Sequence, residues 1–342
     1  MIPITVVQVG PEEEALVLQV LRSGMLAQGE MVQRFEEHCR QMTGAAHAVA
    51  VNNGTTALVA AMEALQLQPG DEVITSPFTF FATAGSIART GARPVFADID
   101  PRTFNIDPAA IERAITPRTR AIIPVHLFGQ VCDMDAILDV AARHGLPVIE
   151  DAAQAIGATY KGRPAGSFGT AGCLSFYPSK NLGAAGDGGM VVTRDEALAA
   201  RLTVMRNHGM QPRYFYRFIG ANFRLDAVQA AVLLVKLPHL QAWSEARRRN
   251  AEWYNQRFAG SAVRTPYADP DCSSIYNQYV VRIARRDEAV EFLKARGIGT
   301  DIYYPLPLHM QDCFKYLGYS AGDFPHAEAA SREVLALPVY PE

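Results

Sequence analysis

Three segments of the 342-residue chain carry side chains that could hold and react with a small charged ligand. The first is residues 52–56, Asn-Asn-Gly-Thr-Thr, between an apolar run and a helix expected to begin near Thr56. Free N–H groups at a helix start attract anions, and Gly54 would let the backbone approach a phosphate closely. An ordinary helix cap explains the segment equally simply, because it matches neither the dinucleotide fingerprint nor the P-loop.

The second segment places Asp151 at the end of an apolar run, with Gln154 three residues later. A carboxylate at the carboxyl end of a strand faces the ligand crevice of an α/β sheet, where it could hold a protonated ring nitrogen or a metal ion. A cap of the next turn is the alternative. Because no His or Cys cluster with ligand spacing lies nearby, we expect no metal site.

The third segment, residues 175–189, contains Ser175 and Lys180 ahead of a glycine-rich run. An amine that reaches the crevice loses water, which lowers its pKa and makes it a nucleophile. A solvated surface lysine is the alternative, and the glycines need mark only tight turns.

The elements that must position these residues follow from the hydrophobic pattern. Short apolar runs separated by helix-length segments predict an α/β fold with a mostly parallel, seven-stranded sheet. Ligands of such sheets bind beyond the carboxyl ends of the strands. The expected strands are residues 47–51, 72–75, 94–99, 121–127, 147–151, 173–177 and 190–193.

The rest of the chain predicts a second, smaller α+β domain. Helices are expected at 194–207, 225–235, 240–258 and 286–296, and a strand at 278–284. The aromatic and basic stretch 208–220 is a candidate mobile loop. We place the large domain at residues 1–237 and the small one at 238–342.

Composition excludes several partners. The 32 Lys and Arg against 35 Asp and Glu give a net charge of −3 with no basic cluster, so we expect no nucleic acid. No apolar run approaches the roughly 18 residues of a membrane span, and no signal peptide is visible, so we expect a cytoplasmic protein. Five scattered cysteines indicate reduced thiols.

Together the three segments supply a phosphate anchor, an acid for a ring nitrogen and an amine, which are the groups that pyridoxal phosphate requires. At this point the sequence resembles the sugar aminotransferases of the DegT/DnrJ/EryC1/StrS family, from about Val20 to Pro341. The matching motifs include NNGTTAL, PGDEVITSPFTFFATA, VIEDAAQAIGATYKG, SFYPSKNLGAAGDGG, NFRLDAVQAAVL and IYYPLPLHMQ.

The resemblance implies the fold of aspartate aminotransferase, fold type I of the pyridoxal-phosphate enzymes, and a role for each matching residue. Lys180 would attach the cofactor covalently and move protons, Asp151 would pair with its ring nitrogen, and Gln154 would bond near its ring hydroxyl. The remaining cofactor contacts would be a stacked Phe80, a phosphate cradle of Thr55, Thr56 and Ser175 beside Gly54, and Asn222 from a partner subunit. A shared site implies a homodimer.

The resemblance also implies glutamate as amino donor and a nucleotide-linked keto hexose, carrying UDP or dTDP, as acceptor. The product would serve surface polysaccharide or a glycosylated metabolite. The chain looks slightly more like the branch that aminates C3 than the C4 branch. Arg213, Tyr214 and Arg224 would suit the phosphates, and Tyr304 and His309 would approach the sugar, although solvated surface and a proline-shaped turn are the alternatives.

Other functions remain to be weighed. A dehydrating branch of the same family has histidine at the position of Lys180, which argues against dehydration. A generic amino-acid transaminase is disfavoured because no match to its carboxylate-binding arginine is found. A non-catalytic sensor or scaffold on the same fold is the alternative from another class, and the intact set of Lys180, Asp151 and Gln154 argues against it.

Overall fold

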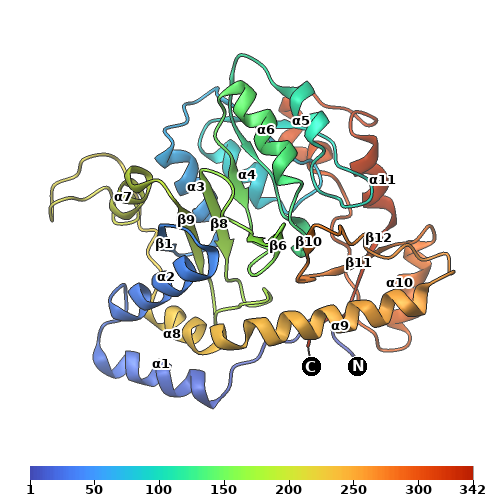
Figure 1. The fold of residues 1–342 in the computed structure, drawn as a ribbon, viewed down its shortest axis with the longest axis horizontal. Helices are drawn as coiled ribbons and strands as arrows, with labels where there is room; N and C mark the ends of the chain where they lie inside the picture. Colours follow the sequence, from blue (N-terminus) through green and yellow to red (C-terminus); the bar gives the residue numbers. More distant parts are fainter. Residues whose placement is uncertain (342) are drawn as a thin grey trace.

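A layer of strands flanked by helices forms the middle of the molecule in the computed structural model, which describes residues 1–341 (Figure 1). Its strands are β1 (His47–Val51), β2 (Glu72–Thr75), β3 (Arg93–Phe96), β4 (Thr119–Ile123), β5 (Ile149–Asp151), β8 (Ala171–Ser175) and β9 (Gly189–Thr193). They form a block of order β1-β9-β8-β5 and a block of order β3-β2-β4.

The two blocks are joined edge to edge. Isolated parallel bridges pair Ile122 with Val148 and Val125 with Asp151, next to β4 and β5. Pairing is parallel between β5 and β8 and on both sides of β2, whereas β9 runs antiparallel to both of its neighbours. Since β5, β8, β2 and β4 therefore end at one edge, the segments that follow them share the crevice expected from the sequence.

Alternating side chains bury both faces of this layer. Val49 and Val51 belong to one core cluster with helices α3 (Gly54–Ala64) and α7 (Glu196–Met205). Ala50 belongs to another cluster, with helices α2 (Glu30–Thr43), α6 (Met134–His144) and α8 (Ala227–Lys236). Burial on both faces explains why these strands read as nearly continuous apolar runs.

The helices around the layer come from the first two thirds of the chain. They are α1 (Pro11–Ser23), α2 (Glu30–Thr43), α3 (Gly54–Ala64), α4 (Ala82–Arg89), α5 (Pro108–Ala114), α6 (Met134–His144), α7 (Glu196–Met205) and α8 (Ala227–Lys236). Side-chain oxygens of the residues just before α3, α5, α6 and α7 accept backbone N–H bonds at their starts, which fixes where these helices begin.

The C-terminal third adds a helix-covered pair of strands. Its elements are α9 (Leu240–Phe258), β11 (Tyr279–Arg282), α10 (Arg286–Lys294), α11 (Pro325–Glu333) and β12 (Val334–Leu337), with β11 antiparallel to β12. The long helix α9 runs from α8 to the strand pair (Figure 1). A small three-stranded sheet joins the two parts of the chain through β10 (Cys272–Ser273), β6 (Thr159–Tyr160) and β7 (Arg163–Pro164). The division at residue 237 stays a prediction.

The expected strands at 47–51 and 72–75 match β1 and β2, but several others were placed with wrong ends. Those at 94–99 and 121–127 run past the ends of β3 and β4, at Phe96 and Ile123. The one at 147–151 begins two residues before β5, the one at 173–177 lies two residues after β8, and the one at 278–284 extends beyond β11 at both ends. After β4 the chain turns into a short 3-10 helix at Leu127–Gly129, although its apolar sequence continues because residues up to Phe128 remain buried. Burial without sheet pairing is what the pattern could not reveal.

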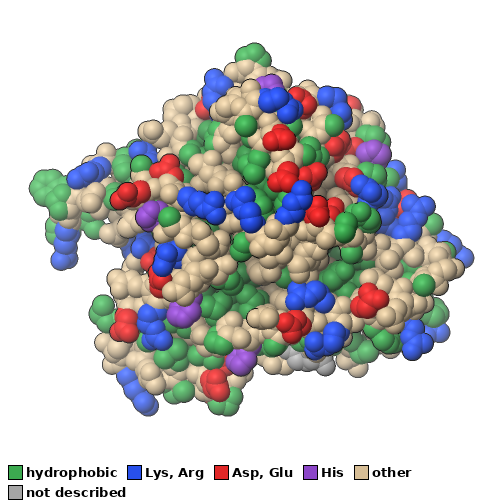
Figure 2. All heavy atoms as spheres, viewed as in Figure 1, with side chains coloured by type: hydrophobic (Ala, Val, Ile, Leu, Met, Phe, Trp, Pro, Cys, Tyr) green, Lys and Arg blue, Asp and Glu red, His purple; other side chains and the backbone are tan. Residues whose placement is uncertain are grey.

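Residues 208–220 project from the body of the molecule beside α7 (Figure 1). Hydrophobic and basic side chains gather at this projection in the space-filling view (Figure 2). Tyr214, Phe215, Tyr216 and Ile219 are all exposed. Within residues 1–341, no helix is long and apolar enough to cross a membrane, and all five cysteines are free thiols.

Candidate active site

A cavity of about 770 Å³ lies at the carboxyl edge of the strands. It collects eight of the residues that the sequence singled out, although they are spread over 250 positions of the chain. They are Gly54, Thr55, Phe80, Asp151, Gln154, Ser175, Lys180 and Tyr304.

Asp151 is the last residue of β5 and is only 5% exposed. Its Oδ2 accepts a bond from the Thr83 hydroxyl at 2.7 Å, and its Oδ1 accepts one from the Ala153 N–H at 3.2 Å. Burial raises the pKa of this carboxyl, and the two hydrogen bonds and the nearby Lys180 oppose that shift. The group is therefore a buried acid whose charge depends on its donors.

Lys180 lies in the turn after β8, where its N–H bonds to the Tyr177 carbonyl at 2.8 Å. Gly183 shapes this turn, because a Cβ there would lie 2.2 Å from the Pro178 oxygen. Within residues 1–341 no hydrogen bond or ion pair reaches the Lys180 amine. Burial lowers its pKa to about 8, against the opposing charge of Asp151. An amine with these properties is a nucleophile and a base near neutral pH.

Gln154 is held rigidly at the wall of the cavity. Its Oε1 accepts the Phe128 N–H at 2.7 Å, and its Nε2 donates to the Tyr304 hydroxyl at 3.1 Å. The rings of Tyr304 and Phe80 lie 6.3 Å apart. Phe80 is 57% exposed, which leaves a ring face open at the cavity.

The start of α3 forms the opposite end of the cavity. The Asn53 side chain accepts the Thr56 N–H at 2.8 Å and caps the helix. Gly54 packs so closely on Ser175 that a Cβ at this position would lie 2.7 Å from the serine Cβ. The cap and the anion site considered for this segment therefore coexist, because the cap leaves the other N–H groups of the first turn available.

The strand that ends in Asp151 is anchored from its other face by Glu150, which is fully buried. Its carboxylate accepts bonds from His126 Nε2 at 2.8 Å and from the N–H groups of Gly166, Phe168 and Gly169 at 2.6 to 2.7 Å. The backbone N–H of His126 in turn donates to the backbone carbonyl of Asp151 at 3.0 Å. This network fixes the backbone that presents Asp151.

Sequence reasoning missed Thr83, Glu150 and His126. Thr83 stands four residues after Thr79 in the sequence, but nothing there indicates that its hydroxyl donates to a carboxylate 68 residues away. Glu150 directly precedes Asp151, and strand alternation alone would have placed the two carboxylates on opposite faces.

Six predicted site residues do not line this cavity. Thr56 lines a neighbouring cavity of about 1120 Å³ beside Phe218 and Phe223. Arg213 and Tyr214 are exposed and bond to each other at 2.9 Å. Arg224 donates to Asn207 Oδ1 at 2.8 Å, and Asn222 is exposed.

His309 is the sixth, and it is 2% exposed in a core below the cavity. Its ring packs edge-on against Phe324 with centroids 4.7 Å apart, and its Nε2 lies 3.2 Å from the Glu328 carboxylate. Burial lowers the pKa of this imidazole, against the opposing effect of Glu328. In this chain the residue packs rather than faces a ligand.

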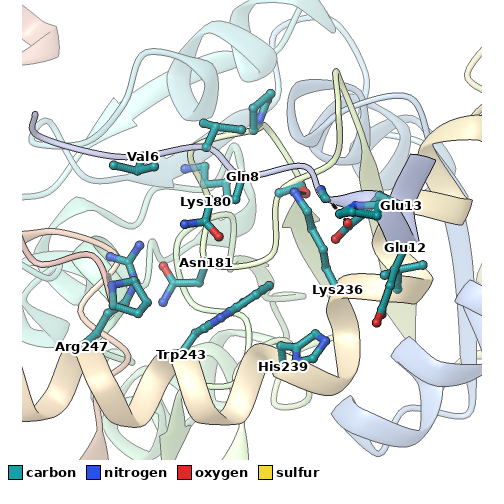
Figure 3. Close-up of a pocket in the computed structure, with 17 residues that line it drawn as sticks. Val6, Gln8, Glu12, Glu13, Lys180, Asn181, Lys236, His239, Trp243 and Arg247 are labelled. Carbon is teal, nitrogen blue, oxygen red and sulfur yellow. Dashed lines mark hydrogen bonds between the residues drawn. The ribbon is translucent and has the colours of Figure 1, made fainter. Parts of the chain in front are cut away.

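A second cavity of about 320 Å³ backs onto the same lysine turn (Figure 3). The N-terminal segment with Val6 and Gln8 passes along it, and Trp243 reaches it from α9. Lys236 Nζ donates to the Gly183 carbonyl at 3.0 Å. Lys180 lines both cavities, so the turn that carries it forms the partition between them. No cluster of His, Cys, Asp or Glu suited to a metal ion occurs in residues 1–341.

Comparison with known proteins identifies the family of the chain. The sequence profile of the DegT/DnrJ/EryC1/StrS aminotransferase family matches residues 7–342. The chain belongs to this family. It is an aminotransferase, and its α/β fold is the one that the family's solved structures share.

Members of the DegT/DnrJ/EryC1/StrS family with high similarity carry different names. A "pleiotropic regulatory protein" of Geobacillus stearothermophilus is 51% identical over 98% of this chain and 91% of its own length. A UDP-N-acetyl-3-dehydro-alpha-D-glucosamine 3-aminotransferase of Acidithiobacillus ferrooxidans is 45% identical over 95% of this chain and 87% of its own length. The crystal structure of S. venezuelae DesV with a ketimine intermediate superposes with a TM-score of 0.95, at 43% identity over 97% of this chain and 90% of DesV.

Proposed function

We propose that the protein is a pyridoxal-phosphate enzyme of fold type I that transfers an amino group from glutamate to C3 of a keto sugar in a UDP- or dTDP-linked hexose. The observation that carries the proposal is the Lys180 amine, which faces a cavity without a bonding partner in residues 1–341, close enough to the buried Asp151 to feel its charge. The 3-aminotransferase relative supports a UDP-linked 3-keto acceptor.

The residues present fit the cofactor at each of its parts. Gly54, Thr55 and Ser175 would hold the phosphate, and the exposed face of Phe80 would stack on the ring. Asp151 would meet the ring nitrogen. When bound, pyridoxal phosphate supplies an electron sink for the carbon that loses a proton.

The chain's own groups then divide the proton chemistry. The negative charge of Asp151 holds a proton on the ring nitrogen. Lys180 Nζ, with a pKa lowered to about 8, would take the proton from the Cα of the amino donor and would deliver it to C4′ of the cofactor. Gln154 orients the ring from the side, because both ends of its amide are already fixed by Phe128 and Tyr304.

The sugar nucleotide requires groups that one chain does not bring to its cavity. We infer that Arg213 and Tyr214 of the projecting region, with Asn222 and Arg224 just after it, complete the site of a second subunit in a homodimer. Arg213, Tyr214 and Asn222 are exposed and Arg224 is half-buried, and guanidinium, phenol and amide groups suit a diphosphate. Tyr304 stays the candidate sugar contact of the cavity wall, since its hydroxyl lies beside Gln154.

The first experiment is the absorbance spectrum of the protein with added pyridoxal phosphate, before and after glutamate. We expect a band of lysine-bound cofactor that glutamate bleaches, and recovery of that band when a UDP- or dTDP-linked 3-keto hexose is added. Recovery with a 4-keto sugar alone would move the amination to C4. A folded protein that gives no band would overturn the proposal in favour of a non-catalytic sensor.

A further inference from the structure

Two buried threonines form a line of hydroxyl groups that leads to the Asp151 carboxylate at the cavity wall. Thr79 lines the cavity and is 2% exposed, and Thr83 is fully buried behind it. Their hydroxyl oxygens lie 3.3 Å apart, and Thr83 Oγ1 lies 2.7 Å from Asp151 Oδ2. Thr79 lies in the bend just before α4 and Thr83 in its first turn, so the chain brings the two hydroxyls together where the helix begins.

The direction of this chain of hydroxyls follows from chemistry. An ionised carboxylate only accepts hydrogen bonds, so the single proton of Thr83 points to Asp151. The Thr83 oxygen is then free to accept from Thr79. The alternative acceptor for Thr83, the Phe80 carbonyl, is farther away at 3.4 Å.

We propose that Thr83, supported by Thr79, is a positioning residue that holds the Asp151 carboxylate ionised and aimed at the ring nitrogen of the cofactor. The inference rests on the proposed function, because only a ring nitrogen gives that charge a partner. A buried carboxylate without strong donors takes up a proton, and a neutral Asp151 cannot keep a ring nitrogen protonated. The Thr83 hydroxyl is the one side-chain donor that Asp151 has within residues 1–341.

Other charged and titratable groups act on Asp151 only through space. The positive charge of Lys180, and of His126 when protonated, favours its ionised form. Burial is the main cause that raises the pKa of the Cys173 thiol and of the Tyr304 hydroxyl, and the Asp151 charge adds to the rise in both. The groups that face Asp151 are Lys180 after β8, His126 after β4, Cys173 in β8 and Tyr304 before α11.

The test compares two cofactors on purified variants without bound cofactor. Pyridoxal phosphate has the ring nitrogen, and 1-deazapyridoxal phosphate has carbon in its place. We expect Thr83→Val to weaken the binding of pyridoxal phosphate about tenfold, which is the effect of losing a hydrogen bond to a charged group. The affinity for the deaza analogue should be unchanged. Thr83→Ser restores the hydroxyl and should restore the affinity. Thr75→Val is the matched control, since this buried threonine bonds only to the Ile123 carbonyl at 2.8 Å.

The outcomes separate the inference from the function. Equal losses for both cofactors, or no rescue by Thr83→Ser, would show that Thr83 is merely structural. If Thr83→Val does not fold, Thr79→Val carries the test, with a smaller loss that is again confined to pyridoxal phosphate. A wild-type protein that fails to bind pyridoxal phosphate would overturn the proposed function, whereas normal binding by Thr83→Val overturns only the role of Thr83.

Discussion

The cavity wall and the projecting region differ in how their polar side chains are held. Asp151 and Gln154 are buried, and every polar side-chain atom of both residues is hydrogen-bonded: both carboxylate oxygens of Asp151, and the amide oxygen and nitrogen of Gln154. Arg213 and Tyr214, by contrast, are exposed and bond to each other. The wall has its geometry before any ligand arrives, whereas the projecting region has groups for a ligand without a cavity around them.

This difference indicates how the work of the site is divided. Rigid strand ends suit a cofactor whose reactive atoms must be placed precisely. The projection has backbone hydrogen bonds of its own, such as Arg217 N–H to the Gly209 carbonyl at 2.8 Å, but its exposed side chains would gain ligand-binding neighbours by packing against another subunit, which the proposed homodimer would provide. Mutations in the cavity wall should therefore impair the chemical step, whereas mutations in the projecting region should impair assembly of the site.

The largest expected effect is at the reacting amine. Lys180→Ala should lower the steady-state rate of amino transfer by at least about 10⁴, because one group supplies both the covalent anchor and the acid-base catalyst. The variant should still fold and melt cooperatively, since nothing in residues 1–341 bonds to the amine. Lys294→Ala on exposed α10 is the control. Activity near that of the control would remove Lys180 from the mechanism.

The next effect is at the buried acid. Asp151→Asn should lower the rate on the order of 10², the cost of losing one preorganised electrostatic group. Asparagine keeps an oxygen that can accept from Thr83, so circular dichroism should be unchanged. Asp271→Asn, at an exposed ion pair with Lys161, should leave the rate intact. If both variants kept full activity, Asp151 would have only a structural role.

A third effect concerns how the free energy of unfolding of the cofactor-free protein depends on pH. The folded pKa of Lys180 is about 8 against an ordinary value of 10.5. Between these values the unfolded chain still binds the proton that the folded chain has released. The free energy of unfolding therefore rises with pH across this window, by about 3 kcal/mol from this group.

Urea unfolding at pH 7 to 10.5 measures this contribution as a difference from Lys180→Met. The variant should be more stable than the wild type at pH 7, and the gap should close by pH 10.5. Lys294→Met should follow the wild-type profile throughout. A gap that does not change with pH would mean that the amine is not desolvated in the folded protein.

The sequence predicted the residues that line the cavity better than it predicted the residues that hold them in place. Asp151, Gln154 and Lys180 could be found because each follows an apolar strand, and parallel strands bring their ends to one edge. Thr83 and the Glu150–His126 pair could not be found, because their partners are set by how β4, β5 and α4 pack together. Tertiary contacts between distant segments carry no local pattern.

The substrate side was harder for a different physical reason. His309 lies in a motif that resembles sugar-contacting segments, but its ring packs against Phe324 and its Nε2 lies beside the Glu328 carboxylate. Motif resemblance gives a residue's place along the chain and leaves its side-chain direction open. Asn222, exposed on this chain, is a residue whose role one subunit cannot reveal.

The smallest expected effect tests whether Asn222, just after the projecting region, works across subunits. Asn222→Ala should weaken activity by loss of a phosphate donor, and Lys180→Ala should be inactive. In an equimolar mixture refolded together, half of the dimers are mixed, and each mixed dimer has one site with both native residues. The mixed dimers should then supply about a quarter of the wild-type activity, in addition to the residual activity of the Asn222→Ala homodimers, which form about a quarter of the sample.

The comparison sample combines the same two variants without refolding. Its activity should stay at the average of the two variants measured alone, because no subunits have exchanged. If refolding together brings no gain above that average, Asn222 acts within its own chain or not at all. A gain would locate the phosphate contact on the partner and explain why exposed residues outside the cavity carry groups that its wall lacks.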